Sequence, residues 1–342
     1  MKALVMEAYK SFALREVPRP EPGPGEVLVR VRACAVCGSD VHGIDGATGR
    51  RRPPVIMGHE AAGEIAQLGV GVTGYRVGER VTFDSTVYCG ECAACSAGDV
   101  NLCKDRRVLG VSCEEYRRDG AFAEYVLVPE RILYRLPDNV SYEEAAMVEP
   151  LSIACHAMGR TAVPQGGRVL VAGAGTIGLL ALQVAKSLGA GQLIAVDVDE
   201  ARLQMARAAG AEAVSSREPG ALERVLKLTG GGGVDVAVDC AGIFETADLC
   251  IRSAKLNGVV VLVGNLAQRI DFPLQLVVTR QLRLFGSCAS AGEYPECLNL
   301  IASGRVDVKR MISKTVPLAE GGEWILKLYN REPGLYKIVL IP

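Results

Sequence analysis

Hydrophobic and polar positions alternate in short runs along the first 150 residues of the chain. The runs are bounded by glycine, proline or charged residues, as in the proline-rich turn from Pro18 to Gly25. An alternation of period two is typical of strands that bury one face. This part of the chain is therefore predicted to consist of strands, at residues 3–6, 12–16, 27–31, 63–66, 80–83 and 123–128.

The pattern changes after Glu149 and Pro150, where apolar, β-branched runs begin to alternate with segments of helical period. This alternation is typical of a parallel sheet covered by helices. The chain is thus predicted to combine an irregular β domain with a doubly wound α/β domain, with a functional site in the cleft between them. The expected strands are residues 169–172, 193–196, 235–238, 259–263, 282–285 and 337–341, and the expected helices include residues 151–159, 294–303 and 324–330.

A glycine-rich turn follows the first of these apolar runs. In Gly173-Ala174-Gly175-Thr176-Ile177-Gly178, the first glycine permits a tight turn and the second lets the backbone approach a pyrophosphate. The third lets the following helix pack against the strand, and the free N–H groups at the N-terminus of that helix favour an anion. The turn, including Thr176 and Ile177, is predicted to bind a dinucleotide; the alternative is a βα turn without a ligand.

Asp197 ends the next apolar run, close to the offset of about 20 residues expected for the acid that binds the ribose of a dinucleotide. Its carboxylate would accept hydrogen bonds from both ribose hydroxyls and repel a 2′-phosphate, which favours NAD over NADP. Arg202, five residues further on, is a second candidate for cofactor contact.

The composition of the 342 residues is that of an ordinary globular protein, with 49% hydrophobic and 23% charged residues. A formal charge of −1 gives no general attraction to nucleic acid or to a membrane surface. The segment from Met1 to Glu7 reaches an acid before a secretory hydrophobic region develops, and no apolar run is long enough to span a bilayer. We therefore expect a cytoplasmic protein whose 12 cysteines are thiols and metal ligands.

Four cysteines form the pattern C-x2-C-x2-C-x7-C in a loop with little apolar content. Four thiolates at this spacing can enclose a zinc ion in a tetrahedral shell that leaves no position for a substrate, so we predict a structural zinc. The alternatives are four thiols without a metal and a zinc ribbon that binds nucleic acid. The surrounding acids balance the surrounding bases, which argues against the ribbon. The predicted ligands are Cys89, Cys92, Cys95 and Cys103.

A second set of metal-binding residue types is spread through the first half of the chain, at Cys37, His59, Glu60 and Glu149. One thiolate, one imidazole and carboxylates suit a zinc with three protein ligands and an open position for water or an alcohol. Cys37 and His59 are predicted to be zinc ligands, whereas the choice of carboxylate is left open. A lone cysteine and a lone histidine are more often packing residues, and that alternative stays open on spacing alone.

Taken together, these motifs resemble those of the zinc-dependent medium-chain dehydrogenases. The resemblance runs from Cys37 through Gly58-His59-Glu60, the four-cysteine loop, residues 119–125, Glu149-Pro150 and the GAGTIG turn. Glu149-Pro150-Leu151 resembles the polyol branch, which includes sorbitol, threonine and sugar-alcohol-phosphate dehydrogenases. The resemblance implies an α/β fold with two parts. The first is a GroES-like irregular β-barrel catalytic domain at residues 1–150 and 289–342, and the second is a Rossmann domain with a doubly wound parallel sheet at residues 151–288.

The resemblance also implies roles for individual residues. Cys37 and His59 bind a catalytic zinc, and either Glu60 or Glu149 completes its shell. Asp40 orients His59 through the other ring nitrogen. The zinc lowers the pKa of a coordinated alcohol, Ser39 takes the proton, His42 is the outlet of the relay, and hydride passes to the nicotinamide. The expected cofactors are therefore NAD and two Zn²⁺ per chain, one catalytic and one structural.

The substrate is less well defined. Sorbitol dehydrogenases typically carry an Arg-Tyr pair where this chain reads Ser287-Cys288, so sorbitol itself is not favoured. Arg51 and Arg118 are candidate contacts for a phosphate or carboxylate on the substrate, although such arginines are usually solvated. We expect a dehydrogenase of a secondary alcohol such as a polyol, a sugar alcohol or a derivative.

Two alternatives remain for the function. One is a broad-specificity alcohol or 2,3-diol dehydrogenase, and the other is a nucleotide-sensing or structural protein that keeps the fold without catalysis. In each case the expected partner is a small molecule rather than a nucleic acid or a membrane. A homodimer or homotetramer is expected, formed through the exposed edge strand at residues 282–285.

Overall fold

The computed structural model describes residues 1–342, which divide into a discontinuous unit and a continuous one. The discontinuous unit contains Met1–Glu149 and Ala291–Pro342, and the continuous unit contains Pro150–Ser290. No helix is both long and apolar enough to cross a membrane.

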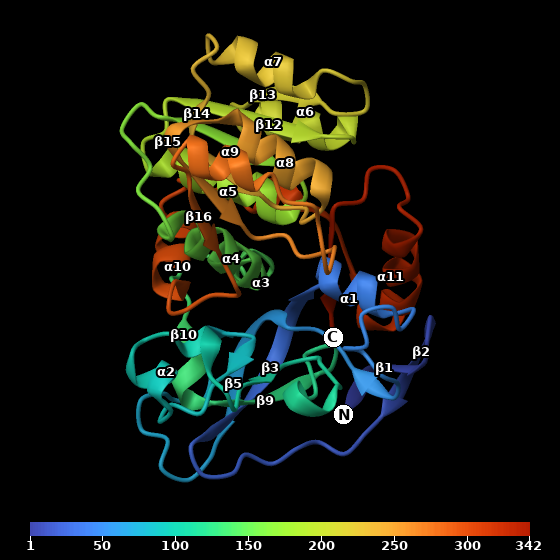
Figure 1. Cartoon of the computed structure of the whole chain (residues 1–342). Helices are drawn as coiled ribbons and strands as arrows, with labels where there is room; N and C mark the ends of the chain where they lie inside the picture. The colour runs from blue at the N-terminus through green and yellow to red at the C-terminus, as the bar shows by residue number, and fades with distance from the viewer. The chain divides into compact units, whose positions relative to one another are not determined.

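The discontinuous unit is built mainly from strands, as the period-two pattern predicted. Its largest sheet has the order β10-β6-β5-β3-β18-β17, and β9 also pairs with β3. The C-terminal strand β18 therefore lies next to β3 from the start of the chain, and in Figure 1 helix α11 lies beside α1. The strands are β1 (Lys2–Ala8), β2 (Ser11–Glu16), β3 (Glu26–Ala35), β4 (Val55–Ile56), β5 (Glu60–Leu68), β6 (Arg80–Phe83), β7 (Thr86–Val87), β8 (Arg107–Val108), β9 (Tyr125–Pro129), β10 (Leu133–Arg135), β17 (Ile312–Pro317) and β18 (Lys337–Ile341).

A single apolar core fills this unit. Alternate residues of β3, such as Val27, Val29 and Val31, are buried against β5, β9 and the C-terminal strand. The helices that pack around the sheets are short, and only two of them, α10 and α11, have nine residues. They are α1 (Gly38–Gly43), α2 (Ala93–Ser96), α3 (Tyr142–Ala146), α10 (Tyr294–Ala302) and α11 (Gly321–Tyr329).

The continuous unit is a doubly wound α/β domain. Six parallel strands have the order β13-β12-β11-β14-β15-β16, with helices between successive strands along the chain. The central strand β11 (Arg168–Ala172) is buried at four of its five residues, which explains its continuous apolar run. The other elements are α4 (Val148–Gly159), α5 (Thr176–Ser187), β12 (Gln192–Asp197), α6 (Glu200–Ala208), β13 (Glu212–Ser215), α7 (Ala221–Leu228), β14 (Val234–Asp239), α8 (Phe244–Ser253), β15 (Ala254–Leu262), α9 (Leu274–Thr279) and β16 (Arg283–Gly286).

The prediction of a strand-rich part and a doubly wound part is confirmed, but it omitted several elements. Strands β13 and β17 form edges of their sheets and bury only one residue each, Val214 and Val316. A strand with so little buried surface carries no apolar alternation for a sequence pattern to detect. Helix α1 was also missed, because six residues are too few to show a helical period.

Candidate metal centres and dinucleotide site

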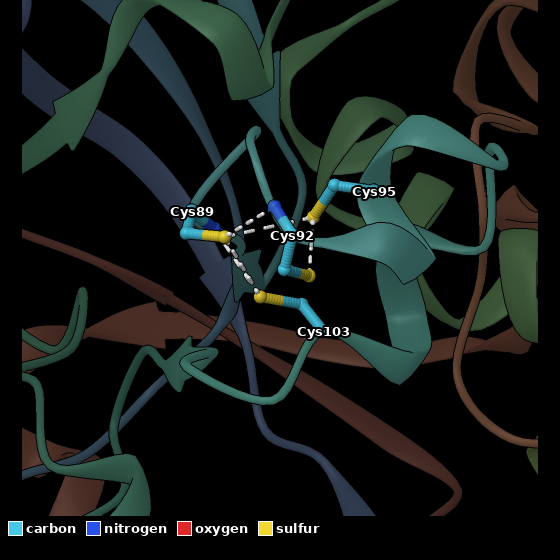
Figure 2. A group of neighbouring side chains, drawn as sticks. All are labelled: Cys89, Cys92, Cys95 and Cys103. Carbon is cyan, nitrogen blue, oxygen red and sulfur yellow. Dashed lines mark hydrogen bonds between the residues drawn. The ribbon is translucent and has the colours of Figure 1, made fainter.

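The four predicted cysteines of the hydrophilic loop come together in the structure. Figure 2 shows their sulfur atoms turned toward one another, with Cys95 on α2 and Cys103 beyond it. The Sγ atoms of Cys92 and Cys95 are 3.5 Å apart, and so are those of Cys103 and Cys89. Four sulfurs at about 2.3 Å from a zinc ion in a tetrahedron lie about 3.8 Å from one another. The cluster therefore has the size of a closed zinc–thiolate shell.

The backbone around this cluster favours the thiolate form of some of its members. The N–H of Cys89 donates to the sulfur of Cys103, and the N–H of Cys92 donates to the sulfur of Cys89. A backbone N–H bond from Cys95 is the main reason that the pKa of Cys92 falls to about 6, whereas desolvation raises the pKa of Cys95 to about 12. A divalent cation would stabilise all four thiolates at once, so the donor set fits a structural zinc.

Cys37, His59 and Glu60 form a second group of metal-binding residues. One ligand atom from each lies within 4.8 Å of the other two. Cys37 precedes α1 and accepts the N–H of Ser39 on its sulfur at 3.4 Å, while His59 and Glu60 lie where β5 begins. The N-terminus of a short helix and the start of a strand thus bring together residues that are 22 positions apart in the sequence.

Asp40 lies beside the imidazole of His59, without a hydrogen bond to it. Its Oδ1 atom lies 3.5 Å from the Nδ1 atom of the imidazole, and its side chain is fully buried. Because Nδ1 faces Asp40, the Nε2 atom is the nitrogen that remains for a metal. The carboxylate on the far side of the ring would also keep the imidazole in the tautomer that metal binding needs.

Glu60 has a partner that the sequence did not indicate. The buried Nζ atom of Lys337, on β18, donates to both carboxylate oxygens of Glu60 at 2.9 and 2.7 Å, and to the carbonyl oxygen of Val36. Burial alone would lower the pKa of Lys337, but the negative charge of Glu60 and the hydrogen bonds to its carboxylate outweigh burial and raise that pKa. A lysine within an apolar strand is the only sequence signal that could have identified this residue.

Glu149 lies outside the group of three, in the first turn of α4. Its Oε1 atom accepts the hydroxyl of Ser85 at 2.9 Å, a contact that sequence reasoning did not anticipate. Burial raises the pKa of Glu149 to about 7, and the charge of Glu60 contributes in the same direction. The carboxyl group is therefore poised to change charge with its surroundings.

The donor chemistry of this second group fits a catalytic metal. Burial, and then the charge of Glu60, hold the pKa of the Cys37 thiol far above its usual range. A divalent cation would reverse that balance, because it favours the thiolate and screens the carboxylates. A cation held by three protein groups keeps a position for a small molecule, in contrast to the four-cysteine shell.

The predicted relay residues lie on α1, next to this group. Ser39 and His42 are both exposed, so their side chains are accessible to a substrate or to solvent. The Oγ atom of Ser39 accepts a hydrogen bond from Nη2 of Arg51 at 3.1 Å. The hydroxyl group of Ser39 thus has Arg51 as a hydrogen-bond partner within the protein.

The two candidate substrate arginines both have partners within the protein. Arg51 is buried and donates to Asp40 at 2.8 Å, in addition to Ser39. Arg118 donates to Glu26 and to the carbonyl oxygen of Leu127, both at 3.0 Å, and so links β3 to β9. A contact of either arginine with a substrate anion stays a prediction.

The glycine-rich turn of the continuous unit has the geometry expected of a dinucleotide site. Gly173 has a φ of +93°, which favours glycine. A Cβ atom on Gly178 would lie 1.9 Å from the carbonyl oxygen of Gly173, so only glycine allows this packing. A Cβ atom on Gly175 would meet nothing within 4 Å, which leaves the backbone at the start of α5 open to a ligand. Thr176 and Ile177 form the first turn of that helix, where free N–H groups suit a pyrophosphate.

Asp197 ends β12 and faces this turn. Its Oδ2 atom accepts the N–H of Ala174 at 2.7 Å, and its Oδ1 atom accepts the N–H of Asp199 at 2.9 Å. Arg202 is exposed, and its Nη1 atom lies 3.8 Å from Asp197 Oδ2. The acid is therefore held in place by the backbone, with a cation beside it that can take part in ribose or phosphate binding.

Comparison with known proteins agrees with these sites. Residues 23–138 match the family described as "Alcohol dehydrogenase GroES-like domain", and residues 176–303 match "Zinc-binding dehydrogenase". The chain is 34% identical to sorbitol dehydrogenase of Bacillus subtilis, over 100% of this chain and 97% of that protein.

Two solved structures show the same likeness. Alcohol dehydrogenase TADH from Thermus sp. ATN1 superposes with a TM-score of 0.95 at 30% identity, over 100% of this chain and 99% of that one. A zinc-binding dehydrogenase from Sinorhizobium meliloti 1021 bound to NADP superposes with a TM-score of 0.89 at 34% identity, again over 100% and 99%. These matches confirm the GroES-like and Rossmann parts of the predicted fold. The chain belongs to the zinc-containing medium-chain alcohol dehydrogenase family, among relatives of the polyol branch.

Proposed function

We propose that this dehydrogenase transfers a hydride between NAD and a secondary alcohol that is a polyol, a sugar alcohol or a derivative such as a phosphate or acid. The observation that carries the proposal is the group of Cys37, His59 and Glu60, with Asp40 behind the histidine. A protein that only bound a nucleotide would have no need of a three-ligand metal group.

We assign two zinc ions to each chain. The four-cysteine cluster holds the structural zinc, which is supported by its sulfur spacing. Cys37 and His59 hold the catalytic zinc together with Glu60 or Glu149. The ammonium group of Lys337 binds both carboxylate oxygens of Glu60, whereas Glu149 accepts a hydrogen bond from the hydroxyl of Ser85. The two carboxylates therefore differ in the partner that each would have to share with a zinc ion. We therefore place the zinc chemistry in the discontinuous unit and the dinucleotide in residues 150–290.

The side chains of α1 perform the proton transfer in this proposal. When bound, the zinc would lower the pKa of a coordinated alcohol. Ser39 accepts the alcohol proton on its hydroxyl oxygen and donates its own proton outward, and His42 passes it to solvent. Support comes from the exposure of both residues and from their positions one helical turn apart.

Asp197 gives the preference for NAD. A carboxylate fixed by two backbone N–H groups would bind the ribose hydroxyls and repel a 2′-phosphate. The exposed Arg202 lies beside Asp197, and one structural relative carries NADP, so the ratio of kcat/KM for NAD to that for NADP is the measurement that tests the preference.

Assembly and cellular setting complete the proposal. Strand β16 pairs only with β15 and leaves one edge open, so we propose a homodimer or homotetramer formed through this edge. We also propose a cytoplasmic setting, in which the cysteines outside the two metal-binding groups stay thiols.

The decisive experiment is a panel of polyols, sugar acids and their phosphate esters, offered with NAD and scored by NADH production. Simple primary alcohols and 2,3-butanediol serve as comparison substrates for the broad-specificity alternative. A kcat/KM for one polyol or derivative well above that of every simple alcohol supports the proposal. Turnover that is highest with simple alcohols or diols would contradict it.

A further inference from the structure

Arg51 is the buried member of a run of three arginines. Arg50 and Arg52 on either side are exposed, as is usual for adjacent cations, whereas the Arg51 side chain is only 4% exposed. A buried guanidinium loses its hydration, which is costly unless nearby groups compensate. The position of Arg51 therefore calls for a specific partner inside the protein.

The fold makes room for this side chain at the end of α1. Gly43 is buried there, and a Cβ atom on it would lie 3.0 to 3.3 Å from the Cδ, Cγ and Cβ atoms of Arg51. The aliphatic part of Arg51 thus packs directly over a glycine of the helix that carries Ser39. A larger residue at position 43 would push the arginine away from its partners.

One nitrogen of Arg51 holds two residues of α1. Nη2 donates to Asp40 Oδ1 at 2.8 Å and to Ser39 Oγ at 3.1 Å. The same Oδ1 atom lies 3.5 Å from His59 Nδ1. Arg51 therefore donates to the proposed proton acceptor and to the aspartate oxygen that lies beside a proposed zinc ligand.

Packing alone does not explain this arrangement. The Nε atom of Arg51 is buried and has no hydrogen-bond partner. A buried donor left without a partner costs about 1–3 kcal/mol. The Nη2 atom of Arg51 nevertheless donates to Ser39 and Asp40. We take these two hydrogen bonds to be the reason for an arginine at this position.

We propose that Arg51 is a positioning residue that fixes the hydrogen-bond direction of Ser39 and the orientation of the Asp40–His59 pair. A guanidinium has only donors and stays protonated at any relevant pH. It therefore occupies one lone pair of the Ser39 hydroxyl. The other lone pair stays available to accept the proton of the alcohol, and the O–H group stays available to donate onward. The inference rests on the proposed function, because the direction of the Ser39 hydrogen bonds matters only if Ser39 takes the proton of the alcohol.

This role differs from direct binding of a substrate anion. In that case the guanidinium would have to leave Asp40, and the carboxylate would be left buried without its charge partner. The structure assigns the Nη2 atom to groups within the protein instead. The two roles separate experimentally, because an anion contact affects charged substrates only.

The test compares Arg51→Ala with Arg50→Ala, an exposed neighbour with the same change, using the best alcohol substrate of the wild type. We expect kcat to fall about 100-fold in Arg51→Ala with little change in KM, and no change in Arg50→Ala. Millimolar guanidinium chloride should restore part of kcat in Arg51→Ala alone. Combining Arg51→Ala with Ser39→Ala should cost little more than Ser39→Ala, because both changes remove one function.

A second measurement does not depend on turnover. Release of zinc to a chelator should be about 10-fold faster in Arg51→Ala, since His59 loses part of its support, and unchanged in Arg50→Ala and Ser39→Ala. If Arg51→Ala does not fold, Arg51→Lys and Gly43→Ala replace it, and each should lower kcat by a smaller factor.

Several outcomes would overturn the inference: wild-type kcat in Arg51→Ala, losses that add fully with those of Ser39→Ala, unchanged zinc release, or a rise in KM confined to anionic substrates. Absence of turnover in the wild type with every alcohol would contradict the proposed function instead. The zinc-release measurement would still decide the role of Arg51 toward His59.

Discussion

Lys337 and Glu60 form an ion pair that is almost completely shut off from solvent, with Nζ 2.7 Å from the nearer carboxylate oxygen and side-chain exposures of 2% and 1%. The pair joins β18, near the end of the sequence, to the first residue of β5. Glu60 also belongs to the group that contains Cys37 and His59.

Replacing Lys337 with methionine should lower the free energy of unfolding by about 3–5 kcal/mol, because Glu60 is left buried without a counter-charge. The double variant Lys337→Met/Glu60→Gln should recover a large part of that loss. Urea unfolding of the metal-free proteins measures both effects. Equal stability of Lys337→Met and the wild type would show that Glu60 is neutral without its partner.

Removing a zinc ligand should separate catalysis from cofactor binding. We expect Cys37→Ser to lower turnover by about 100-fold or more, since the catalytic metal is lost or weakly held, while NADH still binds the continuous unit. Fluorescence titration with NADH and metal analysis test this. Near-normal turnover in a zinc-depleted protein is incompatible with the proposed function.

The four-cysteine cluster should act on stability rather than on chemistry. In Cys92→Ser we expect the zinc content to fall by about one ion per chain and the loop from Cys89 to Cys103 to become sensitive to protease. The kcat of the remaining folded protein should stay within about threefold of the wild type, because a closed shell contacts no substrate. A loss of turnover as large as that of Cys37→Ser would show that this cluster takes part in the reaction.

Asp197 should control the choice between NAD and NADP. In Asp197→Asn the ratio of kcat/KM for NAD to that for NADP should fall by about 10-fold or more, because the amide no longer repels a 2′-phosphate. Asp199→Asn is the matched control, since Asp199 caps α6 and asparagine caps equally well. An unchanged ratio in Asp197→Asn would mean that the ribose binds elsewhere.

The bond network of Glu64 predicts a pH dependence of stability. A hydrogen bond from Arg32 and then one from Tyr142 hold the pKa of Glu64 below its usual 4.5. An acid with a lowered pKa in the folded state stabilises the fold above its ordinary pKa, and that contribution is lost as the pH falls through the folded value. The stability difference between wild type and Glu64→Gln should therefore be largest near neutral pH and shrink below about pH 4.5. A difference that does not vary with pH would show that Glu64 is not ionised in the fold.

The sequence predicted the parts of the molecule in which local pattern and buried surface agree. The sequence located β11 and α5 because β11 is buried and close packing of α5 requires glycine at position 178. It also located Asp197 at the end of the buried strand β12, and the contact of this acid with a ribose stays a prediction. The four cysteines could be grouped because they lie in one short segment of the sequence, and residues of a short loop are also close together in the structure.

Other features depend on contacts between distant residues and left no local signal. Lys337 meets Glu60 across 277 positions, and Ser85 meets Glu149 across 64. Nor does a run of three arginines show which member is buried, since that depends on the space above Gly43. The edge strands β13 and β17 escaped detection for a different reason, because they bury so few residues.

The position of β18 between β3 and β17 has a consequence for the order in which the two units fold during synthesis. Residues 150–290 are continuous and can fold as soon as they are synthesised, as domains generally do. The main sheet of the discontinuous unit is complete only with residues 337–341, which are synthesised after the continuous unit. Until then Glu60 has no lysine beside it. We therefore expect the discontinuous unit to mature after the continuous unit, although most of its residues are translated first.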